Sequence, residues 1–246
     1  MILHLDCPMG LAGDMLLGAL LALHPHREDA LARLNGLGLP GIGYSVEKRP
    51  QGLHAVVAVY GAEEGHEHQD AHHHHHHHHT VADICHILDG LHLPAPVRDN
   101  AKAVYGLLAD AESKAHGCTV EQIHFHEVGT LDAVADVVGC CLLLEELSVE
   151  RVTASPVAVG GGTVRCAHGV LPVPAPATAF LLEGIPTVSG PVERELCTPT
   201  GAALLRRFAA DFGPRPAGTW LRTGVGLGTR EFPDRVNGVT AHLGTP

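Results

Sequence analysis

The sequence predicts an α+β protein in which helices pack on a mixed β-sheet. Helix-type and strand-type hydrophobic patterns follow one another without the strict alternation that a parallel α/β sheet produces. The chain has 246 residues and an apolar content of 45%, enough for a buried core and ordinary for a globular protein. We expect one domain over residues 1–246, because the only break in composition is a histidine-rich segment at 65–80.

The first third of the chain already mixes both kinds of pattern. The expected elements here are a strand at 3–6, helices at 14–22 and 28–34, and strands at 41–47 and 53–60. A glycine-containing turn over Met9–Asp14 connects the first strand to the first helix. Pro50 and Gly52 indicate a turn between the two later strands.

The rest of the chain continues the mixture. A further helix is expected to begin at about 81, and others are expected at 96–116, 131–147, 174–183 and 198–211. Further strands are expected at 152–159, 163–166, 220–227 and 235–243. Thr80 is expected to cap the helix that follows it. Leu131–Leu147 is the longest apolar segment, but acidic residues interrupt it, so no transmembrane span is expected. The N-terminus has no secretion signal, and we expect a cytoplasmic protein.

A histidine tract occupies the middle of the chain. Its members are His66, His68, His72, His73, His74, His75, His76, His77, His78 and His79. Neutral imidazole is a good ligand for Ni²⁺, Cu²⁺ and Zn²⁺. The tract is internal and includes Glu67 and Asp70, which argues against an engineered affinity tag. We expect this segment to be a disordered loop that binds metal ions, most of all nickel. Storage, transport and use of the metal all stay open as its purpose.

The charge balance excludes some classes of partner. Sixteen basic and 27 acidic residues give a net charge of −11 with histidine neutral. This charge argues against nucleic acid or an anionic membrane as partner, and suits attraction of metal cations. The seven cysteines are an odd number without a CxxC pair, so we expect free thiols. A ligand role stays open for Cys7 and Cys197, which adjoin candidate sites.

The strongest candidate for chemistry begins at His124. His124 and His126 alternate, so on an extended segment they project to the same side, and Glu127 follows them directly. Asp132 and Asp136 are four residues apart and share one face of the expected helix. That helix is apolar nearly all round, which is typical of a buried helix.

Two carboxylates on a buried helix need compensation. Like charges in a buried setting are unfavourable unless a cation or strong hydrogen-bond donors offset them. The sequence therefore indicates a metal or a bound basic group near Asp132 and Asp136. The structural alternative is that Thr130 caps the helix, Asp132 favours the helix dipole and Asp136 bonds a neighbouring arginine.

A second candidate lies at the end of the first strand. Asp6 is followed by Gly10 and Gly13 and then by Asp14 at the mouth of a helix. Backbone N–H groups at such a mouth can bind phosphate, and the two acids can hold a cation. Capping by Asp14 and close packing at the glycines explain the pattern equally well.

Two later segments carry possible anion sites. Thr198, Pro199, Thr200 and Gly201 form a strong helix-start signal, for which simple capping is the favoured explanation and anion binding the alternative. The other segment consists of Gly160–Gly162 with Arg165, Cys166 and His168, where glycine allows close approach of a ligand and arginine suits carboxylate or phosphate. An ordinary turn at His168 and Gly169 is the alternative.

These segments together resemble the LarC nickel-insertion family. The matching stretches are Leu5–Cys7 with Gly10 and Ala12–Met15, His124–Gly129 with Asp132 and Asp136, Ala154–Pro156 with Gly160 and Gly162, Cys166–Thr178, and Thr198–Ala203. The histidine tract also resembles the family. As a set, these motifs are highly specific and extend from Leu3 to about Phe232.

The resemblance implies a CTP-dependent chelatase. Such an enzyme inserts Ni²⁺ into pyridinium-3,5-bisthiocarboxylic acid mononucleotide and makes the nickel-pincer cofactor of lactate racemase. CTP with Mg²⁺ or Mn²⁺ is attributed to a C-terminal domain of full-length relatives. The sequence ends at Pro246. We therefore expect the nickel-recruiting N-terminal part, with a separate C-terminal polypeptide and an apo-enzyme such as lactate racemase as partners. Homo-oligomers stay possible.

With that resemblance, each candidate residue receives a role. We expect the tract to gather nickel, and His124 and His126 to bind it. Glu127, Asp132 and Asp136 would be the catalytic acids. Asp6 and Asp14 would hold a second cation or a ribose. The residues expected to bind the substrate or its phosphate are Gly10, Gly13, Arg165, Thr198, Thr200 and Gly201. The alternatives are a non-enzymatic nickel store or metallochaperone, and a metal-dependent phosphohydrolase.

Overall fold

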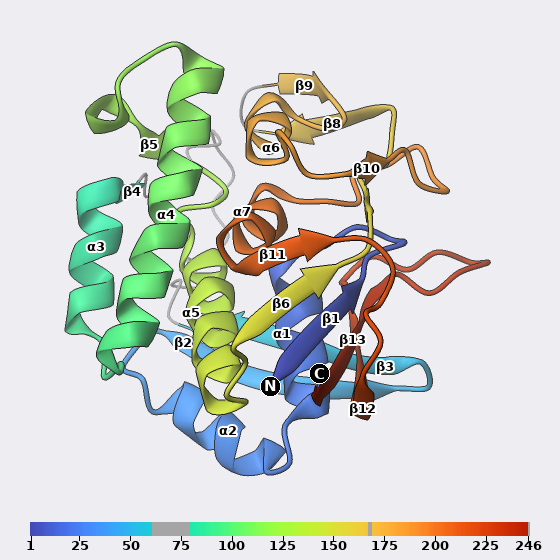
Figure 1. Cartoon of the computed structure of the whole chain (residues 1–246). Helices are drawn as coiled ribbons and strands as arrows, with labels where there is room; N and C mark the ends of the chain where they lie inside the picture. Colours follow the sequence, from blue (N-terminus) through green and yellow to red (C-terminus); the bar gives the residue numbers. More distant parts are fainter. Residues whose placement is uncertain (61–78, 167–168, 246) are drawn as a thin grey trace, which may run out of the picture.

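The computed structural model describes residues 1–60, 79–166 and 169–245 (Figure 1). Within these ranges the main sheet has seven strands. In spatial order they are β11 (Ala209–Phe212), β6 (Arg151–Ala154), β1 (Ile2–Asp6), β13 (Gly238–Thr245), β12 (Thr219–Leu227), β3 (Gly52–Val59) and β2 (Ile42–Arg49). The helices are α1 (Gly13–Leu23), α2 (Arg27–Asn35), α3 (Val81–Gly90), α4 (Ala95–His116), α5 (Leu131–Glu146), α6 (Pro176–Leu181) and α7 (Pro199–Phe208), with a 3-10 turn η1 at Val120–Gln122.

Strand directions in the sheet are mixed, as the sequence predicts. β6 pairs in parallel with both β1 and β11, and β12 pairs in parallel with β3. The β1–β13, β12–β13 and β2–β3 pairs are antiparallel. The first strand therefore lies in the middle of the sheet, where Ile2 is opposite Gly244 near the other end of the chain. The α+β prediction with a mixed sheet is confirmed.

Three short two-stranded sheets stand apart from the main one. They are β4 (His79–Thr80) with β5 (His124–Phe125), β7 (Val157–Ala158) with β10 (Thr187–Val188), and β8 (Thr163–Cys166) with β9 (Gly169–Pro172). The β8–β9 hairpin lies beside α6 in Figure 1, and β5 lies beside α4. These small sheets and the segments next to them carry many of the side chains of the candidate site.

Helix α1 packs directly on the main sheet. Nine of its eleven residues are buried, and it contacts β3, β12 and β13. The contact is close because Gly226 on β12 has no side chain: a Cβ there would lie 1.8 Å from the carbonyl oxygen of Met15. Helix α5 packs against α1, and α4 packs against α5, α6 and α7. The core is therefore continuous from the sheet to α4.

Two expected elements differ from the structure. The strand expected over 152–159 is divided into β6 and β7, because Pro156 cannot donate a ladder hydrogen bond and restricts Ser155. The helix expected to run from 198 to 211 ends at Phe208, since Ala209–Phe212 instead pairs with β6 and forms the edge of the sheet. Pairing at a sheet edge is a tertiary contact that local helix propensity does not reveal.

Helix α3 begins as the sequence predicts. The Thr80 hydroxyl oxygen accepts from the Asp83 N–H at 3.2 Å, and the Asp83 carboxylate accepts from the Thr80 N–H at 2.8 Å. This reciprocal capping box holds Thr80 at the end of β4. No helix among the described residues is long and apolar enough to cross a membrane.

Candidate functional site

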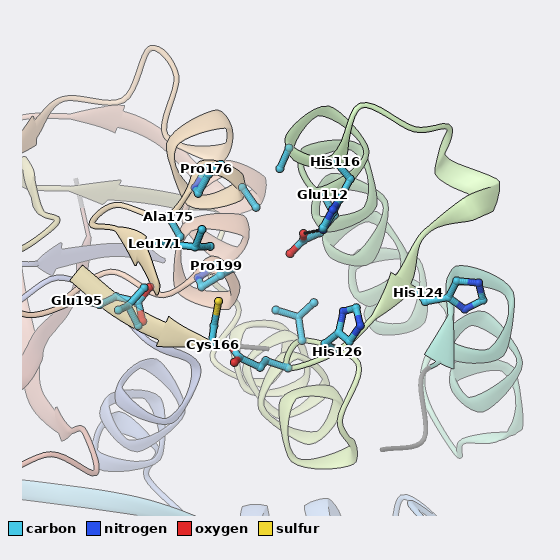
Figure 2. A pocket seen from close by; sticks show the side chains of 15 residues that line it. Glu112, His116, His124, His126, Cys166, Leu171, Ala175, Pro176, Glu195 and Pro199 are labelled. Atoms are coloured by element: carbon cyan, nitrogen blue, oxygen red, sulfur yellow. Dashed lines mark ion pairs between the residues drawn. The ribbon is translucent and has the colours of Figure 1, made fainter. Parts of the chain in front are cut away.

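A cavity of about 360 Å³ opens between α4, the segment that leads into α5, the β8–β9 hairpin and the start of α6 (Figure 2). We call it the donor cavity, because its walls carry imidazole, thiol and carboxylate groups. These side chains are Glu112, His116, His124, His126, Glu127, Cys166 and Glu195. Leu171, Pro176 and other apolar residues complete the walls. The volume is in the range of small-molecule sites, roughly 300–1,000 Å³.

Helix α4 contributes one wall through its last two turns. Glu112 and His116 are one turn apart, and the Glu112 Oε2 and His116 Nε2 atoms lie 3.5 Å from each other. Figure 2 shows this pair facing the cavity. The C-terminal end of a helix favours a cation, so both the carboxylate and the helix dipole support a metal ion bound at His116.

The segment after β5 contributes a second wall. Phe125 is buried against Tyr105, with ring centroids 5.7 Å apart, and this contact fixes the strand. Alternation predicts that His124 and His126 project to one side, but β5 ends at Phe125 and the chain turns there. In Figure 2 His126 points into the donor cavity, whereas His124 points toward α3 at its outer edge. Glu127 lines the cavity beside His126.

The opposite wall carries Cys166 and Glu195. Val164 and Cys166 alternate along β8 and line the cavity, whereas Arg165 between them is exposed and is not among the lining residues. Arg165 therefore does not line the donor cavity, and its role in holding a phosphate stays a prediction. Burial raises the pKa of the Glu195 carboxyl, the charge of Glu127 raises it further, and the guanidinium of Arg230 opposes the rise.

The last histidine of the tract lies beside this site. His79 forms β4 with Thr80, and Thr80 pairs with His124 on β5. The Nδ1 atom of His79 is 2.9 Å from the carbonyl oxygen of Gly129. The remaining histidines of the tract, His66, His68 and His72–His78, lie outside the described residues, as does the loop expected there.

The acids of α5 do not line the donor cavity. Asp132 is exposed, and the Oδ1 atom of Asp136 is buried without a hydrogen-bond partner among the described residues. Burial, followed by the charges of Asp14 and Asp132, raises the pKa of Asp136 well above its usual value. The raised pKa favours the neutral carboxylic acid at Asp136, so no cation is needed beside it to compensate a buried charge. Thr130 occupies the N-cap position, but its hydroxyl donates to the Glu127 carbonyl oxygen at 2.7 Å.

Asp6 and Asp14 lie in separate surroundings. Asp6 accepts from the Nε2 atoms of His4 and His242 at 3.2 and 3.0 Å, so both its carboxylate oxygens are engaged. Asp14 accepts from the backbone and hydroxyl of Thr229, each at 3.1 Å. These hydrogen bonds give the two acids different partners, and a shared cation or ribose site stays a prediction.

The glycines lie in closely packed positions, and the Thr198 segment begins α7. Gly10 has φ +74°, and a Cβ there would lie 2.1 Å from the Leu196 carbonyl oxygen. A Cβ on Gly13 would meet the Asp136 carboxylate at 2.5 Å. Thr198 accepts from the Gly201 N–H at 3.2 Å and caps α7, and binding of the substrate phosphate by this segment stays a prediction. Thr200 and Gly201 are buried.

Sequence reasoning missed three residues of the donor cavity as site residues: Glu112, His116 and Glu195. Cys166 belongs to a candidate segment with Arg165 but receives no role of its own. Glu112 and His116 carry a visible signal, a glutamate and a histidine four residues apart at the end of a helix. Glu195 has no such pattern, because only the tertiary structure places its loop against the cavity. Across residues 1–60, 79–166 and 169–245, no three histidine, cysteine or acidic side chains are already grouped as ligands of one metal ion.

A histidine tract in the sequence, together with a cavity walled by imidazole, thiol and carboxylate groups, is typical of proteins that handle borderline divalent metals. More specifically, the chain matches the family described as nickel insertion protein over residues 3–245, and it belongs to that family. The resemblance found in the motifs is thereby confirmed. No solved structure matches the chain.

Curated relatives support the same family. A pyridinium-3,5-bisthiocarboxylic acid mononucleotide nickel insertion protein of Staphylococcus epidermidis is 40% identical over 94% of this chain and 56% of its own length. The protein with that description from Geobacillus kaustophilus is 38% identical, over 99% and 59%. A putative nickel insertion protein of Pelobacter propionicus is 40% identical, over 100% and 61%. The chain thus spans somewhat over half the length of these relatives.

Proposed function

We propose that this chain receives Ni²⁺ and binds pyridinium-3,5-bisthiocarboxylic acid mononucleotide while nickel is inserted into it. The observation that carries the proposal is the donor cavity, in which nitrogen, sulfur and carboxylate donors from four parts of the chain face one space. Relatives of this similarity are described as insertion proteins for that nucleotide.

The chemistry of the walls suits a metal that has to be passed on. Imidazole and thiolate are good ligands for Ni²⁺, so His126, His116 and Cys166 can hold it during transfer. The thiocarboxylate sulfurs of the nucleotide are soft donors that compete for the same ion. Ligands give up their protons when a metal binds, and the carboxylates of Glu127 and Glu195 line the same cavity and can accept them.

CTP and its divalent cation are not assigned to residues of this chain. The part of the chain that the structure describes holds no ready group of three ligands for Mg²⁺ or Mn²⁺. The relatives are longer, and we propose that CTP acts on the portion that this chain does not cover, supplied as a separate polypeptide. The finished cofactor would then pass to an apo-enzyme such as lactate racemase.

The test is nickel insertion by the purified chain. It is mixed with Ni²⁺, the mononucleotide and CTP, with or without the C-terminal portion of a relative, and activation of apo-lactate racemase is measured. We expect activation when both polypeptides are present. The H126A variant should lose most of it. His92 is an exposed histidine before the opposite end of α4, so H92A is the matched control and should stay active.

Two outcomes would contradict the proposal. Equal activation by the wild-type chain and H126A would show that nickel insertion does not depend on the donor cavity. Tight nickel binding without activation, even with the second polypeptide present, would favour the alternative of a nickel store or metallochaperone, for which the tract alone is sufficient.

A further inference from the structure

Three cavities adjoin one another on the described part of the molecule. The donor cavity shares Glu195 with a cavity of about 190 Å³, which Asp14, Thr198 and Thr229 also line. We call this second space the junction cavity. It shares Gly228, Arg230 and Asn237 with a third cavity of about 410 Å³. The three cavities therefore lie in a row, with Glu195 on the wall between the donor and junction cavities and Arg230 on the wall between the junction cavity and the third.

The third cavity is lined by arginines, although the chain as a whole carries a net charge of −11. Two of these arginines are already paired with acids. Arg49 lies 2.9 Å from a Glu47 oxygen and 3.2 Å from a Glu231 oxygen. The Nε atom of Arg235 donates to Asp234 at 3.0 Å. These pairs neutralise both guanidinium groups locally.

Arg230 differs from them. No carboxylate lies within ion-pair distance of its guanidinium among the described residues, and its side chain donates to the Glu195 carbonyl oxygen at 3.5 Å. Its backbone is held firmly: Asn237 donates to the Arg230 carbonyl oxygen at 3.0 Å, and the preceding Thr229 binds Asp14. Arg230 is thus an exposed cation held where the junction cavity and the third cavity meet.

We propose that Arg230 binds the phosphate of the mononucleotide while the pyridinium ring occupies the donor cavity. This inference rests on the proposed function and names the second half of its substrate site. The mononucleotide has two chemically different ends, sulfur donors on the ring and a phosphate on the ribose. The donor cavity offers metal-binding side chains for the sulfur-bearing ring, and Arg230 on the wall of the junction cavity offers a guanidinium for the phosphate.

Arginine suits this role for a physical reason. Its planar guanidinium can donate two parallel hydrogen bonds to phosphate oxygens, which fixes orientation as well as adding affinity. An acidic protein repels a phosphorylated ligand at long range, so a local cation is needed to hold it. The other phosphate source with this chemistry is a nucleoside triphosphate, which the experiment distinguishes.

The test compares two ligands that differ only by the phosphate. Titration calorimetry without nickel measures binding of the mononucleotide and of its nucleoside, prepared with a phosphatase. In R230A we expect mononucleotide affinity to fall by about 10- to 100-fold, the range for loss of a hydrogen bond to a charged group. Nucleoside affinity should not change. R230K keeps the charge but loses the planar group that donates two parallel hydrogen bonds, so its mononucleotide affinity should lie between those of the wild type and R230A.

The matched control is R222A on β12. Arg222 donates to the Leu23 carbonyl oxygen at 3.2 Å and lines none of the three cavities, so this variant should bind both ligands normally. Thermal unfolding of each variant checks that the fold is intact. Because Arg230 is exposed, its removal leaves no cavity in the core.

Each other outcome has a definite meaning. Unchanged mononucleotide affinity in R230A would overturn the assignment and leave the proposed function standing. A loss of CTP affinity with mononucleotide affinity unchanged would also overturn it, and would give this site to a nucleoside triphosphate. Failure of the wild-type chain to bind either form of the pyridinium ligand would instead contradict the proposed function itself.

Discussion

The ring of His79 is oriented by the backbone of Gly129, through a hydrogen bond of 2.9 Å between Nδ1 and the carbonyl oxygen. A carbonyl oxygen only accepts, so Nδ1 carries the proton and Nε2 of the neutral ring keeps its lone pair. Metal-binding histidines are commonly oriented in this way by a carbonyl on the other ring nitrogen. Because β4 pairs with β5, this ring lies next to the strand that leads into the donor cavity.

We therefore expect His79 to act in transfer of nickel rather than in its accumulation. H79A removes one histidine of ten in the tract, so nickel stoichiometry should hardly change. The rate of cofactor formation at scarce nickel should fall, and excess nickel should restore it. H72A, which removes another histidine of the same tract, is the control. Equal rates for H79A and H72A would show that position 79 has no special role.

Thiol reactivity should mark the donor cavity. Cys166 is partly exposed and lines it, whereas burial raises the pKa of Cys197 and of Cys141 to about 12. Since the thiolate is the reactive form, iodoacetamide at pH 8 should label Cys166 long before those two. Mass spectrometry should show that nickel with the mononucleotide protects Cys166. Cys118, partly exposed and outside the cavity, should stay equally reactive.

The buried carboxyl of Asp136 should make stability fall as pH rises. Its folded-state pKa is raised above the unfolded value, so its contribution is fully present below the unfolded pKa, near 4, and is lost as pH rises through the folded pKa. D136N cannot ionise. Urea unfolding from pH 4.5 to 8 should show the free energy of unfolding of D136N rising steadily relative to that of the wild type. This trend is expected whatever the difference between the two at any single pH. A difference that is constant with pH would contradict this.

Gly10 should be needed for folding rather than for ligand binding. Its φ is +74°, and a Cβ would lie 2.1 Å from the Leu196 carbonyl oxygen. We expect G10A to lower the free energy of unfolding by about 1–3 kcal/mol through backbone strain and overpacking. Gly90 in α3 has open space around it, so G90A should instead stabilise by about 0.5–1 kcal/mol. Thermal or urea unfolding of G10A, G90A and the wild type measures both changes, and opposite signs are expected.

Several features of this protein are determined by the sequence because they are local. Hydrophobic period identifies α1 and α5, turn chemistry identifies the β2–β3 hairpin, and a threonine followed by a helical pattern predicts the caps at Thr80 and Thr198. The histidine tract and the motif around His124 are also contiguous, so the family can be recognised from the order of residues alone.

The tertiary structure alone decided which side chains share a space. Glu112, Cys166 and Glu195 come from parts of the chain far apart in sequence, and no local pattern shows that α4, the β8–β9 hairpin and the 195 loop converge. The same holds for Asp136. The sequence predicts a cation or a donor that compensates its charge, whereas in the folded protein burial raises its pKa and favours the neutral acid. Local patterns encode helices, strands and caps, whereas a site depends on long-range packing.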